Sequence, residues 1–253
     1  MKAVVLITGA TSGFGKAIAE RFAAEGSDVI ITGRRNELLQ ELKKDLESKH
    51  NIQVLALHFD VRNKNEVDQF LQDIPEPWQK INIVVNNAGL AAGKDYFDEA
   101  SLDDWEQMID TNVKGLIYVT RAVLPYLIKN GNAHIINIGS IAGKQVYEKG
   151  NMYCTTKHAV DAITQSMRID LLRHKMKVTA IHPGMAETEF SLVRFKGNDK
   201  AAKSVYEGLK PLQAEDVADA VFYCASLPQH VCINDLVIMP TAQADAFYSY
   251  KDL

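Results

Sequence analysis

The sequence predicts an α/β fold, namely a single-domain, doubly wound parallel sheet of about seven strands with helices on both faces. Short, continuously apolar runs rich in Val and Ile alternate with longer segments of helical periodicity. A glycine-rich turn follows the first apolar run directly. Continuous apolar runs are typical of parallel strands that are buried on both faces. Right-handed crossover connections then place the helices on both sides of the sheet.

The elements can be justified in chain order. Seven apolar runs are predicted as strands: 4–7, 29–31, 54–57, 81–85, 135–138, 178–181 and 236–238. Helical periodicity covers 16–24, 105–129, 153–173 and 215–227. Asn36 is predicted to be the N-cap of a further helix, and Ser101 with Asp104 predicts a capping box before another.

Residues 1–253 are expected to form one domain, because neither a Pro/Gly/Ser-rich linker nor an internal repeat interrupts the pattern. A length of 253 residues is ample for one large hydrophobic core. The segment 185–212 breaks the rhythm, since it is polar and contains Gly197, Asn198 and Pro211. A long excursion between two strands is expected to cover a site.

The charge and residue composition exclude several classes of protein. Lys and Arg number 28 and Asp and Glu 32, which gives a net charge of −4 and disfavours nucleic acid as a partner. No stretch approaches the ~20 apolar residues of a membrane span. The three cysteines form no Cys-x-x-Cys motif, and the seven histidines are scattered. We therefore expect a cytoplasmic protein with no membrane contact, no disulfide framework and no metal.

The turn after the first strand predicts a dinucleotide site. Gly9, Gly13 and Gly15 stand in a Gly-x-x-x-Gly-x-Gly spacing between a strand and a helix. Residues without a Cβ allow the tight turn, and they let a pyrophosphate approach the backbone N–H groups at the helix N-terminus.

The end of the second strand indicates which dinucleotide is bound. A site for NAD places an acidic residue there to bind the ribose 2′-hydroxyl, but this chain has Gly33 followed by Arg34 and Arg35. Arg34 is expected to stack on adenine or pair with a 2′-phosphate, and Arg35 to pair with that phosphate. NADP(H) is therefore the predicted cofactor.

Two Tyr-x-x-x-Lys motifs occur, and they serve as controls for each other. Tyr153 and Lys157 follow a predicted strand that ends at Ser140, on the sheet edge where doubly wound folds bind ligands. Tyr206 and Lys210 lie in the polar excursion without such a strand. We expect the first pair to be catalytic and Tyr206 to be a packing or covering residue.

These motifs, in this order, resemble the short-chain dehydrogenase/reductase family, although Phe14 stands where the family usually has Ile. The resemblance implies oxidoreduction between an alcohol and a carbonyl, with Asn112 joining Ser140, Tyr153 and Lys157 through a water-linked proton relay. It also implies a set of cofactor contacts beyond the glycines and arginines. These are Thr11, Ser12, Phe14, Asp60, Val61, Asn87, Ala88, Gly89, Tyr153, Lys157, Pro183, Gly184 and Thr188.

The expected chemistry fits these residue types. Carbonyl reduction needs a hydride from the cofactor and a proton for the developing alkoxide. Tyr153 is expected to give the proton, with the cation of Lys157 lowering the pKa of its phenol from about 10. Ser140 is expected to donate a hydrogen bond to the substrate oxygen.

The segment 187–197 resembles a narrower group, the NADP-dependent 3-hydroxy acid dehydrogenases. This resemblance implies a homotetramer and substrates such as serine, allo-threonine or 3-hydroxypropionate with malonic semialdehyde. For a substrate carboxylate, Arg194 is the first candidate, with Lys144 and Lys196 behind it. Gln145, Tyr147 and Asn151 are further candidates for the substrate pocket.

Two other functions stay open at this point. One is a broad-range ketoreductase that acts on neutral ketones and aldehydes. The other is a non-enzymatic NADP sensor, which the presence of Ser140, Tyr153 and Lys157 disfavours.

Overall fold

The computed structural model describes residues 3–252 and confirms the doubly wound parallel sheet. Seven strands lie in the order β3-β2-β1-β4-β5-β6-β7, and every neighbouring pair is parallel. The strands are β1 (Val4–Thr8), β2 (Asp28–Gly33), β3 (Val54–His58), β4 (Ile81–Asn86), β5 (His134–Ile138), β6 (Lys177–Pro183) and β7 (Asp235–Ile238). The order reverses between β1 and β4, which is the point where open α/β sheets bind ligands.

Nine α-helices connect and flank the strands within the described residues. They are α1 (Gly13–Ala24), α2 (Asn36–Lys49), α3 (Lys64–Gln72), α4 (Leu102–Ile109), α5 (Leu116–Asn130), α6 (Asn151–Asp170), α7 (Glu189–Arg194), α8 (Asp199–Ser204) and α9 (Ala214–Ser226). Over residues 3–252, none of these helices has the length and apolarity needed to cross a bilayer.

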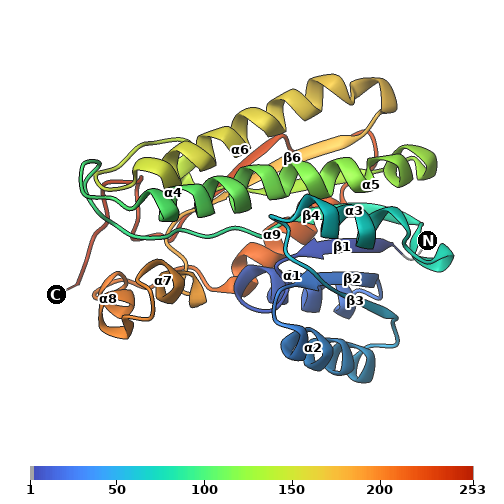
Figure 1. Cartoon of the computed structure of the whole chain (residues 1–253), viewed down its shortest axis with the longest axis horizontal. Coiled ribbons are helices and arrows are strands. Elements are labelled where there is room, and N and C mark those ends of the chain that lie inside the picture. The colour runs from blue at the N-terminus through green and yellow to red at the C-terminus, as the bar shows by residue number, and fades with distance from the viewer. Residues whose placement is uncertain (1–2, 253) are drawn as a thin grey trace.

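The sheet separates two hydrophobic cores, and alternate residues of each strand point to opposite cores. In β1, Val5 and Ile7 pack with α1, α2 and α9, whereas Val4 and Leu6 pack with α3 and α5. Figure 1 shows the same layers, with α5 and α6 along one side of the sheet and α1 and α2 along the other. This burial on both faces explains why the strands are continuously apolar in the sequence.

The predicted element boundaries are close, with a few corrections. The first helix begins at Gly13 and not at residue 16, because the last glycines of the turn already have helical hydrogen bonding. Asn36 is the first residue of α2, and Arg35 occupies the N-cap position. Ser101 caps α4 as predicted, accepting a hydrogen bond from the backbone N–H of Asp104.

The excursion 185–212 is not irregular, since it contains α7 and α8. Its two ends are joined, because the N–H of Glu187 donates to the carbonyl of Leu212 at 2.9 Å and the N–H of Leu212 to that of Met185 at 3.0 Å. Figure 1 shows both helices beyond one end of the sheet. The segment therefore projects from β6 as a closed unit over the carboxyl edge of the sheet.

Candidate active site

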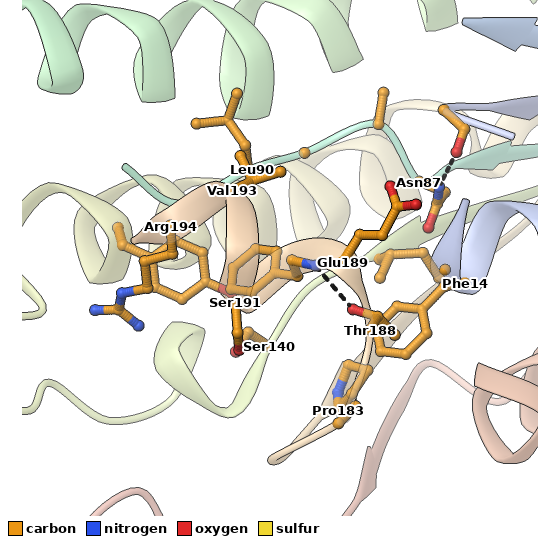
Figure 2. Close-up of a pocket in the computed structure, with 18 of the residues that line it drawn as sticks. Phe14, Asn87, Leu90, Ser140, Pro183, Thr188, Glu189, Ser191, Val193 and Arg194 are labelled. Atoms are coloured by element: carbon orange, nitrogen blue, oxygen red, sulfur yellow. Dashed lines mark hydrogen bonds between the residues drawn. The ribbon is translucent and has the colours of Figure 1, made fainter. Parts of the chain in front are cut away.

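One large pocket of ≈ 520 Å³ lies at the carboxyl edge of the sheet. Residues at or just after the ends of β1 to β6 line it, among them Gly9, Gly33, Asp60, Asn87, Ser140 and Gly184. The excursion supplies the opposite wall through residues of α7 and its flanks. Figure 2 shows Phe14 and Asn87 toward one end and Arg194 toward the other, with Ser140 between them.

The glycine turn is built as the spacing predicts. Gly9 and Gly13 have φ angles of +67° and +51°, a region that favours glycine. A Cβ on Gly15 would lie 2.3 Å from the carbonyl oxygen of Gly9, so no side chain fits there. Gly15 does not line the pocket, unlike Gly9 and Gly13, because it packs the first turn of α1 against the loop.

The ends of β1 and β4 are fastened to each other beside this turn. The Oγ1 of Thr8 accepts hydrogen bonds from the N–H groups of Asn87 at 3.0 Å and Ala88 at 2.9 Å. The amide of Asn87 donates in return to the carbonyl of Thr8 at 2.8 Å. Most of the predicted cofactor contacts line this end of the pocket. They are Gly9, Thr11, Ser12, Gly13, Phe14, Arg34, Arg35, Asp60, Val61, Asn87, Ala88, Gly89, Pro183, Gly184 and Thr188.

Arg35 has an acidic partner that its local sequence does not reveal. Its guanidinium donates to the Oγ1 of Thr11 at 3.0 Å and to a carboxylate oxygen of Glu189, also at 3.0 Å. Glu189 is the first residue of α7 and lines the pocket, as Arg35 and Thr11 do. Arg34 forms no ion pair within the described residues, and it lines the same pocket as Arg35.

Ser140, Tyr153 and Lys157 converge at the centre of the pocket, and all three are buried. Ser140 follows β5, whereas Tyr153 and Lys157 lie one turn apart on α6. The ammonium of Lys157 donates to the carbonyl of Ile138 at 2.9 Å and lies 5.9 Å from the centre of the Tyr153 ring.

The pKa of Tyr153 differs from the expectation. Burial raises the pKa of its phenol well above the usual value, although a hydrogen bond with Ser140 and the charge of Arg194 act in the opposite direction. Burial also lowers the pKa of Lys157 to about 8. The raised pKa of Tyr153 follows from removal of its phenol from water. The lowering by Lys157 stays a prediction.

Asn112 lies beside the pocket and not in its wall. It belongs to a π-helical turn, Asp110–Gly115, between α4 and α5. Its amide donates to the carbonyl of Leu90 at 2.8 Å and to the Oγ1 of Thr156 at 3.0 Å, and its oxygen accepts from the N–H of Leu90 at 2.8 Å. Asn112 thus joins the segment after β4 to α6, one residue from Lys157.

At the far end of the pocket, Arg194 and Tyr147 lie together as the sequence suggests. The Nη1 of Arg194 donates to the hydroxyl of Tyr147 at 3.0 Å, and the guanidinium carbon lies 5.6 Å from the centre of the Tyr153 ring. The other substrate candidates do not line the pocket. Gln145 accepts a hydrogen bond from the N–H of Ala246, and Asn151 donates to the carbonyl of Asp95.

The expectation that Lys144 or Lys196 binds a substrate carboxylate is also wrong, because each ammonium is already paired with aspartates elsewhere. Lys196 binds Asp104 at 2.8 Å. Lys144 lies 3.0 Å from Asp161 and 2.5 Å from Asp235. The second Tyr-x-x-x-Lys motif is structural as expected, since the hydroxyl of Tyr206 donates to the carbonyl of Ala186 and contacts Ser191.

His182 is a buried neighbour of the site that sequence reasoning missed. Its Nδ1 lies 3.1 Å from the carbonyl oxygen of Ser140, and its Nε2 lies 3.1 Å from Asp235. Asp161, His182 and Asp235 bring ligand atoms within 4.8 Å of one another, as some metal sites do. Here the ammonium of Lys144 bridges the two carboxylates, so the cluster holds a cation of the chain itself.

Comparisons with known proteins agree with this geometry. A family model described as short chain dehydrogenase matches residues 3–198. An NADP-dependent 3-hydroxy acid dehydrogenase of Salmonella typhi is 48% identical, over 96% of this chain and 97% of the relative. Sulfoacetaldehyde reductase 2 of Chromohalobacter salexigens is 47% identical, over 96% of each chain.

Solved structures give the same result. A closed form of serine dehydrogenase complexed with NADP+ superposes with a TM-score of 0.91, at 47% identity, over 99% of this chain and 100% of the other. Serine dehydrogenase from Escherichia coli gives a TM-score of 0.81 at 44% identity, over 95% of this chain and 99% of the other. The chain therefore belongs to the short chain dehydrogenase family and is an oxidoreductase that interconverts hydroxy and carbonyl groups.

Proposed function

We propose that this enzyme uses NADP(H) to interconvert a small hydroxy acid and the corresponding carbonyl compound. The observation that carries the proposal is the position of Arg194. Its guanidinium lies 5.6 Å from the ring of Tyr153, in the same pocket as the glycine turn. A substrate whose carbonyl oxygen reaches Tyr153 can then place an acid group on Arg194, as the 3-hydroxy acid and sulfoacetaldehyde relatives suggest.

The cofactor end of the pocket fits a phosphorylated dinucleotide. Gly9, Ser12 and Gly13 line the pocket at the N-terminus of α1, which suits a pyrophosphate. Gly33 supplies no carboxylate to oppose a 2′-phosphate, and Arg34 and Arg35 face the pocket. When bound, the nicotinamide supplies or accepts the hydride.

The chain's own residues handle the proton and the oxygen. We assign Tyr153 as the proton donor in the reducing direction, because its raised pKa keeps the phenol protonated at neutral pH. Ser140, hydrogen bonded to the same phenol, donates to the substrate oxygen as negative charge develops. Lys157 would hold the nicotinamide ribose. Asn112 positions the segment at Leu90 and helix α6 around Tyr153 and Lys157. The water-linked relay through Asn112 stays a prediction.

The experiment that tests this function compares two tyrosines and one arginine. We expect Tyr153→Phe to lower kcat by at least about 10²-fold, the range of general acid catalysis. Tyr206→Phe is the matched control and should keep kcat within about twofold of the starting protein. We expect Arg194→Ala to raise KM for malonic semialdehyde by about tenfold or more, with little change for a neutral aldehyde of similar size.

Two outcomes would overturn this function. Higher kcat/KM for neutral ketones than for acidic substrates, with Arg194→Ala without effect, would favour the broad-range ketoreductase. An unchanged biological role for Tyr153→Phe, with no carbonyl reduced by the starting protein, would favour the NADP sensor. The substrate series is measured as NADPH oxidation at 340 nm, the absorbance of the reduced nicotinamide.

We also propose that cofactor and substrate share one domain, with 185–212 as the covering segment, and that the enzyme is a cytoplasmic homotetramer. Large apolar side chains exposed at the end of α6 and just after it support an association surface, since Ile169 is 73% exposed and Leu172 70%. Three free cysteines suit a reducing compartment. Sedimentation equilibrium would test the tetramer, and a monomer at micromolar concentration would exclude it.

A further inference from the structure

Lys94 is a second cation at the substrate end of the pocket, beside Arg194. The loop that carries Lys94 is joined to the end of α7 by a pair of hydrogen bonds between Gly93 and Arg194. The N–H of Gly93 donates to the carbonyl of Arg194 at 3.1 Å, and the Nε of Arg194 donates to the carbonyl of Gly93 at 3.3 Å. Both Lys94 and Arg194 line the pocket. The fold thus brings together two basic residues that are far apart in the sequence.

The loop that carries Lys94 is fixed by its own contacts. Gly93 has a φ angle of +72°, and a Cβ there would lie 3.0 Å from a carboxylate oxygen of Asp95. The amide of Asn151 donates to the carbonyl of Asp95 at 3.0 Å, and the hydroxyl of Tyr96 donates to Glu148 at 3.0 Å. These bonds tie the loop to the start of α6, so Lys94 is held at the pocket mouth.

The charge of Lys94 has no acidic partner. Within the described part of the chain, neither Lys94 nor Arg194 forms an ion pair, whereas Lys196 binds Asp104 and Lys144 binds two aspartates. Burial lowers the pKa of Lys94, and the neighbouring cations Arg194 and Lys149 lower it further, against the opposing effect of Glu148. Two neighbouring positive charges without counterions repel each other, and an anion bound between them relieves that repulsion.

The donors that remain on Arg194 and Lys94 indicate which shape of acid group fits best. The Nε of Arg194 is used by the carbonyl of Gly93, and one N–H of its Nη1 by Tyr147. The Nη2 of Arg194 and the remaining N–H of its Nη1 can bind two oxygens side by side, and a planar carboxylate bound in this way has no oxygen outside that plane. The ammonium of Lys94 is then available for a third oxygen, and a tetrahedral acid group such as a sulfonate has one.

Resting on the proposed function, we propose that Lys94 determines substrate specificity by binding, together with Arg194, the third oxygen of a sulfonate on the aldehyde substrate. A carboxylate substrate would use Arg194 in the same way but gain little from Lys94. This inference names the substrate class as short aldehydes or alcohols that end in a sulfonate.

The test is a comparison of kcat/KM for three aldehydes with NADPH: sulfoacetaldehyde, malonic semialdehyde and a neutral aldehyde of similar size. Lys94→Met removes the charge and keeps most of the apolar stem. Its ratio of kcat/KM for sulfoacetaldehyde to that for the neutral aldehyde should fall at least about fivefold, the effect of one partly exposed ion pair. The same ratio for malonic semialdehyde should fall by less than about twofold.

Lys149→Met is the matched control. Lys149 belongs to the same group of cations, but its ammonium lies 4.0 Å over the ring of Tyr96 and it does not line the pocket. In Lys149→Met, the ratios of kcat/KM for the two acidic aldehydes to that for the neutral aldehyde should equal those of the starting protein. Equal losses for all three aldehydes in Lys94→Met, or the same loss in Lys149→Met, would overturn the role of Lys94.

The same data separate this inference from the proposed function. If acidic aldehydes are preferred and Arg194→Ala removes the preference, the proposed function holds whatever Lys94→Met does. If Lys94→Met then leaves the sulfonate ratio unchanged, the inference about Lys94 alone has failed. If neutral aldehydes are preferred from the start, the proposed function has failed first.

Discussion

Single residues in this pocket have partners that come from distant parts of the chain, and Arg35 is the clearest case. The sequence predicts that Arg35 pairs with a 2′-phosphate, but the structure pairs it with Glu189 at 3.0 Å. Both side chains are about half exposed, at 45% and 53%, so solvent screens the pair. The carboxylate nevertheless competes with a phosphate for the same guanidinium.

Replacing that carboxylate should improve the binding of NADPH. We expect Glu189→Gln to lower KM for NADPH by two- to fivefold, which corresponds to at most about 1 kcal/mol for an exposed pair. KM for NADH should stay unchanged, because NADH has no 2′-phosphate. Glu187→Gln is the control, since Glu187 is exposed and does not line the pocket. Steady-state kinetics that gave a higher KM for NADPH would contradict this assignment of Arg35.

The residues that could be predicted are those that sit in local motifs. Tyr153 and Lys157 are one helical turn apart, and the glycines follow a strand, so short-range patterns were sufficient. Lys94 and His182 belong to no motif. His182 contacts Ser140, and Gly93, which precedes Lys94, is hydrogen bonded to Arg194, so only the folded chain brings these residues together. A single sequence carries no signal for such pairs.

At the scale of elements, the strands and long helices were predictable, and the departures have local causes. Hydrophobic periodicity identified all seven strands within one or two residues of their observed ends. It did not reveal the π-helical turn at Asp110–Gly115, since one extra residue in a helix leaves the apolar pattern almost intact. It also missed α3, which has nine residues and buries only Val67 and Leu71. The helices α7 and α8 were missed as well, since they are six residues each and too short for a periodic signal.

Strand β5 carries a buried histidine that should make stability depend on pH. His134 faces Lys177 across the β5–β6 pair and contacts the Oγ1 of Thr179 at 2.7 Å. Burial, with a smaller contribution from the charge of Lys177, lowers the pKa of His134 from 6.5 to about 3. Below pH 6.5 the unfolded chain takes up a proton that the folded chain does not, so stability falls as the pH decreases toward 3.

Urea denaturation at pH 7.5 and pH 5.0 would measure this loss. We expect the free energy of unfolding to fall by about 2 kcal/mol from this group between pH 7.5 and 5.0. The variant His134→Gln, which can keep the bond to Thr179, should lose less stability over the same interval. Some loss should persist, because burial lowers the pKa of His182 too. An identical loss in the variant would rule out His134 as a source.

The whole molecule combines a net charge of −4 with local groups of positive charge at both ends of one pocket. Arg34 and Arg35 lie toward the cofactor end, and Arg194 and Lys94 toward the substrate end. Such an arrangement favours ligands that carry an anionic group at each end, while the overall charge disfavours polyanions such as nucleic acids. Because the pocket lies between the sheet and the excursion, ligand binding should stabilise the fold as a whole.

Thermal unfolding in the presence of NADP+ or NAD+ would test whether the bound dinucleotide stabilises the fold and whether Arg34 and Arg35 select it. At about 100 times its Kd, a ligand adds ~2.7 kcal/mol to the free energy of unfolding. For a chain of this size each kcal/mol raises Tm by roughly 2–4 °C, so NADP+ should raise Tm by about 5–10 °C. At the same concentration NAD+ should raise Tm by clearly less, because it leaves Arg34 and Arg35 without a phosphate.

Replacing both arginines by serine should remove the difference in Tm between NADP+ and NAD+, whereas Arg173→Ser, on the short helix after α6, should preserve it. Equal shifts with NAD+ and NADP+ in the starting protein would show that these arginines do not select the cofactor.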